Sequence, residues 1–416
     1  MNKIFVNVSR WYKMHDYYEF AYNELYKNNS IITYAFFERK TTDFSKIGEL
    51  KENDFLKIFF YDSFDDLLNQ IKNIDNLFYI NTFDEVIVPT VHDLRLHLWL
   101  NVSTHYESFR KKDKQRDILL KSYPETTVKY KSIDLDQDIE DYAYYLDFPY
   151  IIKPSSWVQS SWVSKINNID DLKKYIANAK DLETNMTNRW IVNNNYLIEE
   201  FIDWEMYTIV YFVNNNWEIF YSPVVKVKWA EKIWIDDFFN YVRLNWKIID
   251  SELPIDMVKE FVDKQVKAFW IKNTYIFQDF KLNSKWVLKN IELNARIWGY
   301  RLEMMQNLYW FNLLEMPLWK TLEPKSDFSN AVFVFYALSK WIFDWYDNEL
   351  LSMIQKLKSF SSLRLSKQSI GNKCWSTKDW FWSLAAVRLK TNDLDIFKSD
   401  YLFLETNYKK LIKIKN

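Results

Sequence analysis

The sequence predicts a mixed α/β and α+β protein, in which a parallel α/β domain precedes an antiparallel region and a small C-terminal α+β lobe. Short apolar strands and amphipathic helices alternate over the first hundred or so residues, which is typical of parallel sheets covered by helices. Longer strands joined by turn residues follow from about position 190, which favours antiparallel pairing. The 416 residues, 48% hydrophobic and 27% charged, suffice for two or three globular domains.

The N-terminal domain is predicted to span residues 1–108. Apolar runs of strand length alternate there with segments of helical periodicity, so a parallel sheet with helices on its faces is expected. The predicted elements are strands at 3–8, 31–37, 77–80 and 85–88, and helices at 14–26 and 64–71.

The central region is predicted to span residues 109–325, divided at 109–196 and 197–325, and the C-terminal lobe to span 326–416. Short turns join the later strands, which we therefore expect to pair antiparallel. The predicted helices lie at 112–121, 136–146, 254–269 and 349–358. The predicted strands lie at 150–153, 162–166, 190–201, 205–213, 218–228, 275–281, 287–294 and 331–337.

Composition and charge exclude several classes of protein. The 55 Lys and Arg residues balance the 56 Asp and Glu residues, so nucleic-acid binding is not expected as the main role. The single cysteine, Cys374, excludes a disulfide framework and a multi-cysteine zinc site. The N-terminus does not resemble a secretory signal, and no apolar run reaches the roughly 18 residues of a membrane span. We expect a cytoplasmic protein with no membrane partner.

The chain has 20 tryptophans and 3 glycines, whereas glycine normally occupies about 7% of positions. Many tryptophans, such as Trp204, Trp217 and Trp286, lie between polar residues at predicted turns, where a positive φ or a missing Cβ is needed. We hypothesise that most are glycines in the natural protein, from a genome that reads UGA as glycine. The alternative is a non-catalytic, aromatic-rich protein that binds carbohydrate or nucleic acid. The spread from Trp11 to Trp382 disfavours it.

The first chemical motif is segment 150–164. An apolar strand ends at Lys153 and Pro154, and a loop of small polar residues follows. If Trp157 and Trp162 are glycines, backbone N–H groups can approach anionic oxygens there, and the lysine supplies positive charge. A phosphate-binding loop is predicted, with a plain surface hairpin as the alternative. The predicted ligands are Lys153, Ser155, Ser156, Ser160 and Ser161.

The second motif is a carboxylate pair, Glu199-Glu200, at the end of an apolar strand. The chain turns at 203–204 before a new strand begins. Such a pair is usually a solvated edge. It can instead belong to a hinge whose backbone binds the edge of an adenine ring while a carboxylate holds ribose.

The third motif is a hairpin with acidic and amide side chains. Glu292, Asn294 and Arg296 alternate along one strand and so project from one face, and Asp279 lies on the neighbouring strand. Oxygen ligands without His or Cys suit Mg²⁺ or Mn²⁺ shared with phosphate oxygens. The polar outer face of a half-buried sheet would show the same alternation.

In this order and spacing, the three motifs resemble the ATP-grasp superfamily. The last is similar to the family signature Glu-x-Asn-x-Arg-x-Gly-Gly once Trp298 is read as glycine. The likeness covers roughly residues 105–325, after a plausible pre-ATP-grasp domain. The segments that carry it are Lys153-Pro154-Ser155, 199–204 and 292–299.

The resemblance implies which residues bind ATP. Two lysines would contact its phosphates, namely Lys153 and, at the start of a helix, Lys112, with Lys114 as a rival. Glu205 would hold the ribose, although the family often places this acid one residue later, where the chain has Met206. The adenine hinge would consist of Glu199, Glu200, Phe201 and Ile202.

The resemblance also implies the catalytic groups. Arg296, with Lys153, would steady the acyl phosphate and the transferring phosphoryl group, and Arg301 would assist with the substrate carboxylate. The ligands of two Mg²⁺ (or Mn²⁺) ions would be Asp279, Glu292 and Asn294. The four histidines all precede this region and are expected to be structural.

The implied function is an ATP-dependent carboxylate–amine ligase that joins a small acid to an amine through an acyl phosphate. Positioning and electrostatics supply nearly all of this chemistry, so no His or Cys nucleophile is needed. Specificity is expected to depend on loop 224–243 and the tail after 326, and homodimers are common in the family. An ATP-grasp phosphotransferase is the near alternative. A nucleotide-binding module without turnover is disfavoured because the motif residues are retained.

Overall fold

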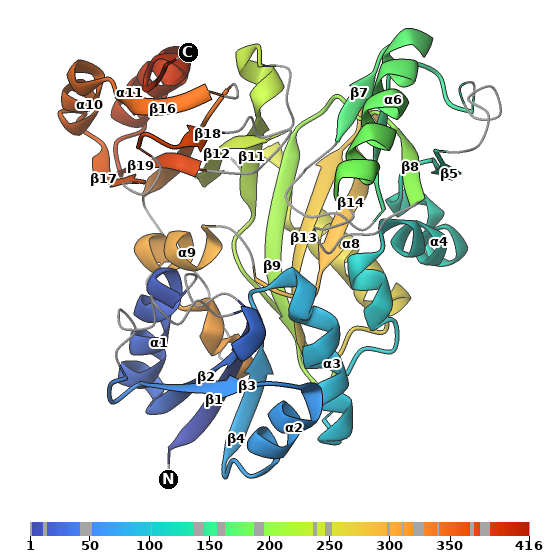
Figure 1. Ribbon diagram of the computed structural model, residues 1–416, viewed down its shortest axis with the longest axis vertical. Coiled ribbons are helices and arrows are strands. Elements are labelled where there is room, and N and C mark those ends of the chain that lie inside the picture. Colours follow the sequence, from blue (N-terminus) through green and yellow to red (C-terminus); the bar gives the residue numbers. More distant parts are fainter. Residues whose placement is uncertain are drawn as a thin grey trace.

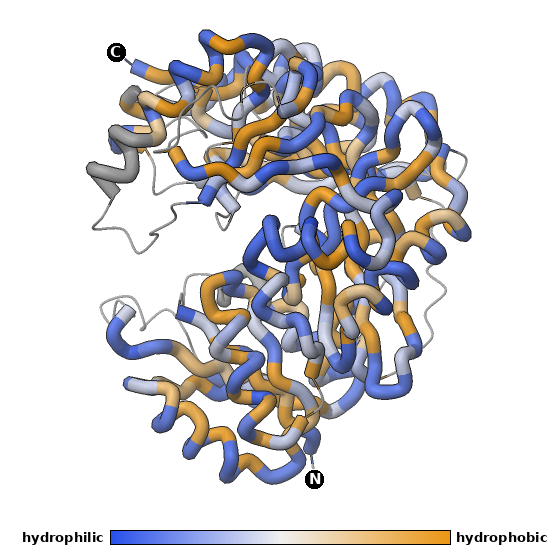
Figure 2. The backbone as a smooth tube through the Cα atoms, turned by 90° about the vertical axis from the view of Figure 1, so that its right-hand side faces the viewer, coloured by the Kyte–Doolittle hydropathy of each residue, from blue (hydrophilic) through white to orange (hydrophobic). Residues whose placement is uncertain are grey.

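The computed structural model describes residues 2–10, 15–41, 52–100, 102–135, 143, 145–155, 163–186, 195–235, 239–245, 252–297, 300–309, 311–318, 328–338, 341–366, 370–374 and 383–415. Figure 2 shows two lobes joined along one side, the lower one with the N-terminus and the upper one with the C-terminus. Within these ranges no helix has the length and apolar character needed to cross a membrane.

The N-terminal domain is the predicted parallel α/β layer structure (Figure 1). The strand order is β3-β2-β1-β4, and all the pairings are parallel. Alternate residues of β1 face opposite sides, so Phe5 packs with α1, whereas Val6 packs with α2 and α3. The bounds are β1 Lys3–Ser9, α1 His15–Asn29, β2 Ile31–Glu38, β3 Leu56–Tyr61, α2 Phe64–Lys72, β4 Leu77–Asn81 and α3 Val88–His97.

The strand predicted at 85–88 is wrong. Residues Glu85–Ile87 form a 3-10 turn that leads directly into α3. The Asp84 side chain accepts a hydrogen bond from the Val86 N–H, and Pro89 lies in the first turn of α3. These helix-starting features outweigh the strand preference of the β-branched run.

The first part of the central region is a four-stranded antiparallel sheet of order β5-β8-β6-β7. Helix α6 (Ile169–Met186), which the sequence analysis did not predict, packs Leu172 and Ile176 against Ile152 of this sheet. The helix predicted at 136–146 falls largely outside the described residues. The bounds are α4 Lys112–Ser122, β5 Tyr130–Asp134, β6 Tyr150–Pro154, β7 Ser164–Ile166 and β8 Asn195–Glu200.

A second sheet joins the rest of the central region to the C-terminal lobe. Its order among the described residues is β14-β13-β9-β11-β12-β15-β19-β17, with β10 paired to β9. The strand predicted at 218–228 is two strands, because Pro223 cannot donate to the ladder. The bounds are β9 Met206–Val213, β10 Ile219–Tyr221, β11 Val225–Trp229, β12 Asn240–Asn245, α8 Ile255–Ala268, β13 Thr274–Leu282, β14 Leu288–Asn294, α9 Arg301–Tyr309, β15 Ser329–Tyr336, β17 Phe360–Leu365 and β19 Ser383–Thr391.

The remaining C-terminal elements pack above these last strands (Figure 1). They form a three-stranded sheet of order β18-β16-β20 and two helices. Strands β15, β19 and β17 continue the central sheet. The hydrogen bonds between β12 and β15 therefore connect the two sides of the domain boundary proposed at 325/326. The bounds are β16 Trp341–Tyr346, α10 Asn348–Gln355, β18 Lys373–Cys374, α11 Leu394–Asn407 and β20 Ile412–Lys415.

Within the described ranges, five tryptophans have the left-handed backbone that favours glycine. They are Trp99, Trp217, Trp234, Trp270 and Trp286, with φ between 49° and 68°. Trp99 follows Leu98, the C-cap residue of α3, and there the Leu100 N–H bonds to the Arg95 carbonyl and the Trp99 N–H to the Leu96 carbonyl. This pair of bonds is the Schellman helix end, whose left-handed residue is usually glycine. The geometry supports the glycine hypothesis at these positions.

Candidate active site

A pocket lies between the four-stranded sheet and the β13–β14 end of the large sheet. Its volume is about 780 Å³, part of it open to solvent. The lining residues are Lys112, Ile151, Lys153, Pro154, Val163, Glu199, Glu200, Phe201, Ile202, Met206, Trp229, Asp279, Lys281, Ile291 and Glu292. All three predicted motifs therefore contribute to one pocket.

A buried ion triad holds Lys153 in place. The Nζ of Lys153 lies 2.7 Å from Glu199 Oε2, and Arg116 Nε lies 3.0 Å from Glu199 Oε1. Burial lowers the pKa of Lys153 to about 8, despite the opposing charge of Glu199. Burial would raise the pKa of Glu199, but the charges of Arg116 and Lys153 outweigh it and hold that pKa below its usual value. Lys153 thus faces the pocket as a partly desolvated cation.

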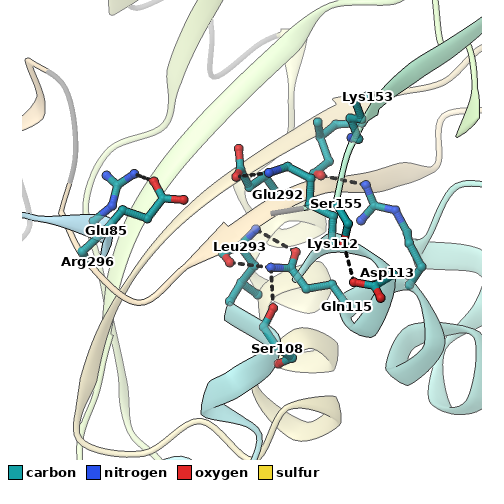
Figure 3. A network of polar contacts seen from close by, with 12 residues as sticks. Glu85, Ser108, Lys112, Asp113, Gln115, Lys153, Ser155, Glu292, Leu293 and Arg296 are labelled. Atoms are coloured by element: carbon teal, nitrogen blue, oxygen red, sulfur yellow. Dashed lines mark hydrogen bonds and ion pairs between the residues drawn. The ribbon is translucent and has the colours of Figure 1, made fainter. Parts of the chain in front are cut away.

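The second predicted phosphate lysine, Lys112, lies at the start of α4 with its Nζ 2.8 Å from Glu292 Oε1 (Figure 3). Its rival Lys114 is exposed to solvent. Gln115 fixes α4 on the hairpin, because its side chain donates to the Leu293 carbonyl and accepts from the Leu293 N–H. The helix therefore presents Lys112, and not Lys114, to the pocket.

The predicted metal ligands lie together. Asp279 and Glu292 are direct partners in the β13–β14 register, and Asn294 follows two residues later on the same face. The buried oxygens Asp279 Oδ1 and Asn294 Oδ1 have no hydrogen-bond partner among the described residues. Burial and the Glu292 charge raise the pKa of Asp279 to about 8, as expected for two carboxylates that share a site.

These oxygens fit a hard divalent cation, which prefers carboxylate and amide ligands. Within the described ranges, no three His, Cys, Asp or Glu side chains cluster closely enough to hold a metal ion. A cation site would therefore combine two carboxylates, Asp279 and Glu292, with the Asn294 amide.

The two predicted arginines have different partners. Arg296 pairs with Glu85 of the N-terminal domain, apart from the Lys112–Glu292 pair (Figure 3). Arg301 begins α9, and its Nε lies 3.0 Å from Thr208 Oγ1. Thr208 is the register partner of Asp279, so Arg301 contacts the residue directly beside Asp279 in the sheet.

The predicted adenine hinge forms one end of the pocket, and Lys281 lies against it. The Nζ of Lys281 donates to the Ile202 carbonyl at 2.7 Å, and burial lowers the pKa of Lys281 to about 8. Glu205, the predicted ribose carboxylate, does not line this pocket; it lies 3.6 Å from Lys226, whereas Met206 does line it. Its ribose role remains a prediction.

Of the predicted loop ligands, Ser155 is buried and donates to Asp113 Oδ1 at 2.5 Å, next to the pocket. Ser156, Ser160 and Ser161 lie outside the described residues. Sequence reasoning missed Arg116 and Lys281, although helical spacing puts Arg116 on the Lys112 face and alternation puts Lys281 on the Asp279 face. No sequence signal pointed to Glu85.

Two sheets of the mixed α/β fold thus enclose a pocket lined by lysines and carboxylates. Residues 146–302 match the family model described as the ATP-grasp domain. Among curated proteins, none matches the chain.

Solved structures resemble the whole chain. The crystal structure of L-amino acid ligase from Bacillus licheniformis has a TM-score of 0.73 and 14% identity, covering 100% of this chain and 99% of that one. Phosphoribosylglycinamide synthetase from Anaerococcus prevotii has a TM-score of 0.61 and 15% identity, covering 100% of both chains. N5-carboxyaminoimidazole synthetase from Staphylococcus aureus, complexed with ADP, has a TM-score of 0.67 and 13% identity, covering 97% of this chain and 98% of that one. At these identities the likeness establishes the fold.

Proposed function

We propose that the protein is an ATP-dependent carboxylate–amine ligase that works through an acyl phosphate. The observation that carries this proposal is the meeting of Lys112, Lys153, Asp279 and Glu292 in one pocket. Two cations facing two carboxylates suit a triphosphate whose charge is shared between side chains and a divalent cation. The similar ligase and synthetase structures support the same reaction class.

The lysines would bind the phosphates. Lys153 is held by Glu199 and Arg116, so its ammonium is already positioned before nucleotide enters. Lys112 would exchange part of its contact with Glu292 for a phosphate oxygen. Charge-assisted contacts of this kind position the γ-phosphorus for in-line attack by the acid.

Asp279, Glu292 and Asn294 would hold the divalent cations, two in our proposal, shared with the phosphates. When bound, such ions neutralise charge on the transferring phosphoryl group. The side chains contribute two carboxylates and one amide, and two of their buried oxygens, Asp279 Oδ1 and Asn294 Oδ1, have no hydrogen-bond partner in the described part of the chain. Arg301 and Arg296 would add positive charge beside the acid substrate.

The reaction balances without a protein nucleophile. An oxygen of the substrate carboxylate bonds to the γ-phosphorus, the bond to the β–γ bridging oxygen breaks, and ADP leaves. The amine nitrogen then bonds to the acyl carbon, phosphate leaves with the former carboxylate oxygen, and the nitrogen loses a proton to solvent.

The test is a pairwise screen of amino acids and small carboxylates for ATP-dependent phosphate release. It would use native protein, or a variant carrying Trp157→Gly, Trp162→Gly, Trp204→Gly and Trp298→Gly. A ligase releases phosphate only when acid and amine are both present, and hydroxylamine in place of the amine traps the acyl phosphate as a hydroxamate. A phosphorylated product that accumulates without an amine would favour the alternative, a phosphotransferase. Absence of both products in the full screen would refute the proposed chemistry.

Cytoplasmic location and homodimer formation stay predictions of the sequence. Light scattering of the purified protein would decide the second.

A further inference from the structure

One face of the large sheet carries arginines beyond the pocket. Directly paired residues of neighbouring strands project from the same face, and so do residues two apart on one strand. The row from β14 to β17 is Glu292, Asp279, Thr208 and Val225, then Val227, Arg243, Val332, Arg388 and Ser362. The carboxylate pair and these arginines therefore lie on one side of one sheet.

Arg243 is a buried guanidinium in this row, with 6% of its surface exposed. Its Nη1 donates to the Asn240 carbonyl at 3.2 Å, its charge acts on the Tyr336 hydroxyl, and its Cζ lies 5.3 Å from the centre of the Tyr300 ring. These partners are neutral, and no ion pair to Arg243 occurs among the described residues. Because a buried charge is costly without a counter-charge, the site is suited to an anion.

Arg364, two residues after Ser362 on β17, reaches the same tyrosine. Its Nη2 donates to the Tyr300 hydroxyl, and its Cζ lies 5.2 Å from the ring centre. Two guanidinium groups at one ring repel each other. An anion that contacts both arginines would reduce that repulsion.

Arg388 of the same row already has an acidic partner, since its Nη2 lies 2.5 Å from Glu303 Oε1. Arg301, by contrast, contacts Thr208, the residue of the row directly beside Asp279. Arg243 lies on β12, two strands beyond Thr208 in the same sheet. Both guanidinium groups therefore belong to the side of the sheet where phosphoryl transfer is proposed.

We propose that the acid substrate carries a second anionic group, which Arg243 and Arg364 bind beside Tyr300 while its reacting carboxylate lies near Arg301. This inference rests on the proposed ligase function. Strand β12 is the third strand from β13 in the sheet, so the two strands lie about 14 Å apart. An arginine side chain on β12 can extend over about half of that distance. The two anionic groups would lie roughly 7 Å apart, as in a short dicarboxylate or a phosphorylated carboxylic acid.

The test compares acids that differ only in the distal group. Glutarate is paired with valerate, and 3-phosphoglycerate with glycerate, each with ATP, Mg²⁺ and hydroxylamine. In at least one pair, we expect the KM of the dianionic acid to be about ten- to a hundredfold lower than that of its partner. The pair that shows this difference identifies the distal group as carboxylate or phosphate. Equal KM values within both pairs would overturn this inference while leaving the ligase function intact. If no acid gives a hydroxamate, either here or in the pairwise screen, the result would instead count against the proposed function.

Variants separate binding from folding. Arg243→Gln and Arg364→Gln should each raise the KM for the dianionic acid about tenfold and leave that for the monoanionic acid unchanged. Arg39→Gln, at an exposed arginine of the N-terminal domain, is the matched control. The thermal shift caused by Mg·ADP checks that each variant folds, and if Arg243→Gln does not fold, Arg364→Gln decides. If a folded variant keeps the wild-type ratio between the KM values for the dianionic and the monoanionic acid, the assignment of the two arginines is refuted.

Discussion

Lys153 Nζ lies 2.7 Å from Glu199 Oε2, so a lysine placed to bind phosphate is also half of a buried ion pair. Arg116 holds the other oxygen of the same carboxylate, and its Nη2 donates to the Ile291 carbonyl of β14 at 2.7 Å. The triad thereby connects α4, the four-stranded sheet and the hairpin of the large sheet. Glu199 thus fixes the position of Lys153 and ties together the walls of the pocket.

The two ends of this pair should respond differently to substitution. Glu199→Gln leaves Arg116 and Lys153 buried without their counter-charge and should lower the free energy of unfolding by about 3–5 kcal/mol. Lys153→Met keeps the Arg116–Glu199 pair and should cost less stability, while weakening Mg·ATP binding at least tenfold. Urea denaturation and calorimetric titration measure the two effects. Equal stability losses in both variants would contradict this assignment of roles.

Cation binding should release a proton at neutral pH. The pKa of Asp279 is raised to about 8, so its carboxyl is mostly protonated at pH 7 in the free protein and must ionise to bind a cation. Titration of Mg·ATP in buffers of different ionisation enthalpy should show release of about 0.9 proton at pH 7 and about 0.1 at pH 9. Apparent affinity should rise as the pH passes through 8. Asp279→Asn should abolish the release, and a release that persists in this variant would assign the proton elsewhere.

Much of the pocket was predictable because each motif is local. Lys153 ends an apolar strand, and Glu292 and Asn294 alternate on another, so backbone geometry alone fixes the direction of each side chain. In the structure, residues of all three motifs line one pocket, and Asp279 is the register partner of Glu292.

What could not be predicted depends on contacts between distant parts of the chain. Glu85 reaches Arg296 across 211 positions, and nothing near either residue indicates the pairing. The contact also depends on the 3-10 turn at Glu85–Ile87, where the sequence analysis predicted a strand. The arginine row likewise depends on strand order, which local patterns do not specify.

Glu85 is expected to be a positioning residue for Arg296. Glu85→Gln removes the charge that holds the guanidinium and should lower kcat about tenfold, with little change in Mg·ATP affinity, because the lysines are untouched. Single-turnover kinetics and nucleotide titration separate the two quantities. Glu107→Gln, at an exposed acid on the surface of the same region, is the control. A parallel loss of affinity and kcat would indicate a general structural role instead.

The tryptophans with positive φ offer the last test. Trp99 and Trp234 are 95% and 92% exposed, so their indoles bury almost nothing, while their left-handed backbone costs about 1 kcal/mol for a residue with a Cβ. Trp99→Gly and Trp234→Gly should therefore each raise the free energy of unfolding by up to about 1 kcal/mol in urea denaturation. Trp345→Gly should lower it, because this residue lies within β16 without a positive φ and its indole donates to Asn348. The intact mass of the native protein gives an independent answer: a mass that matches 20 tryptophans would refute the glycine hypothesis, whatever the variants show.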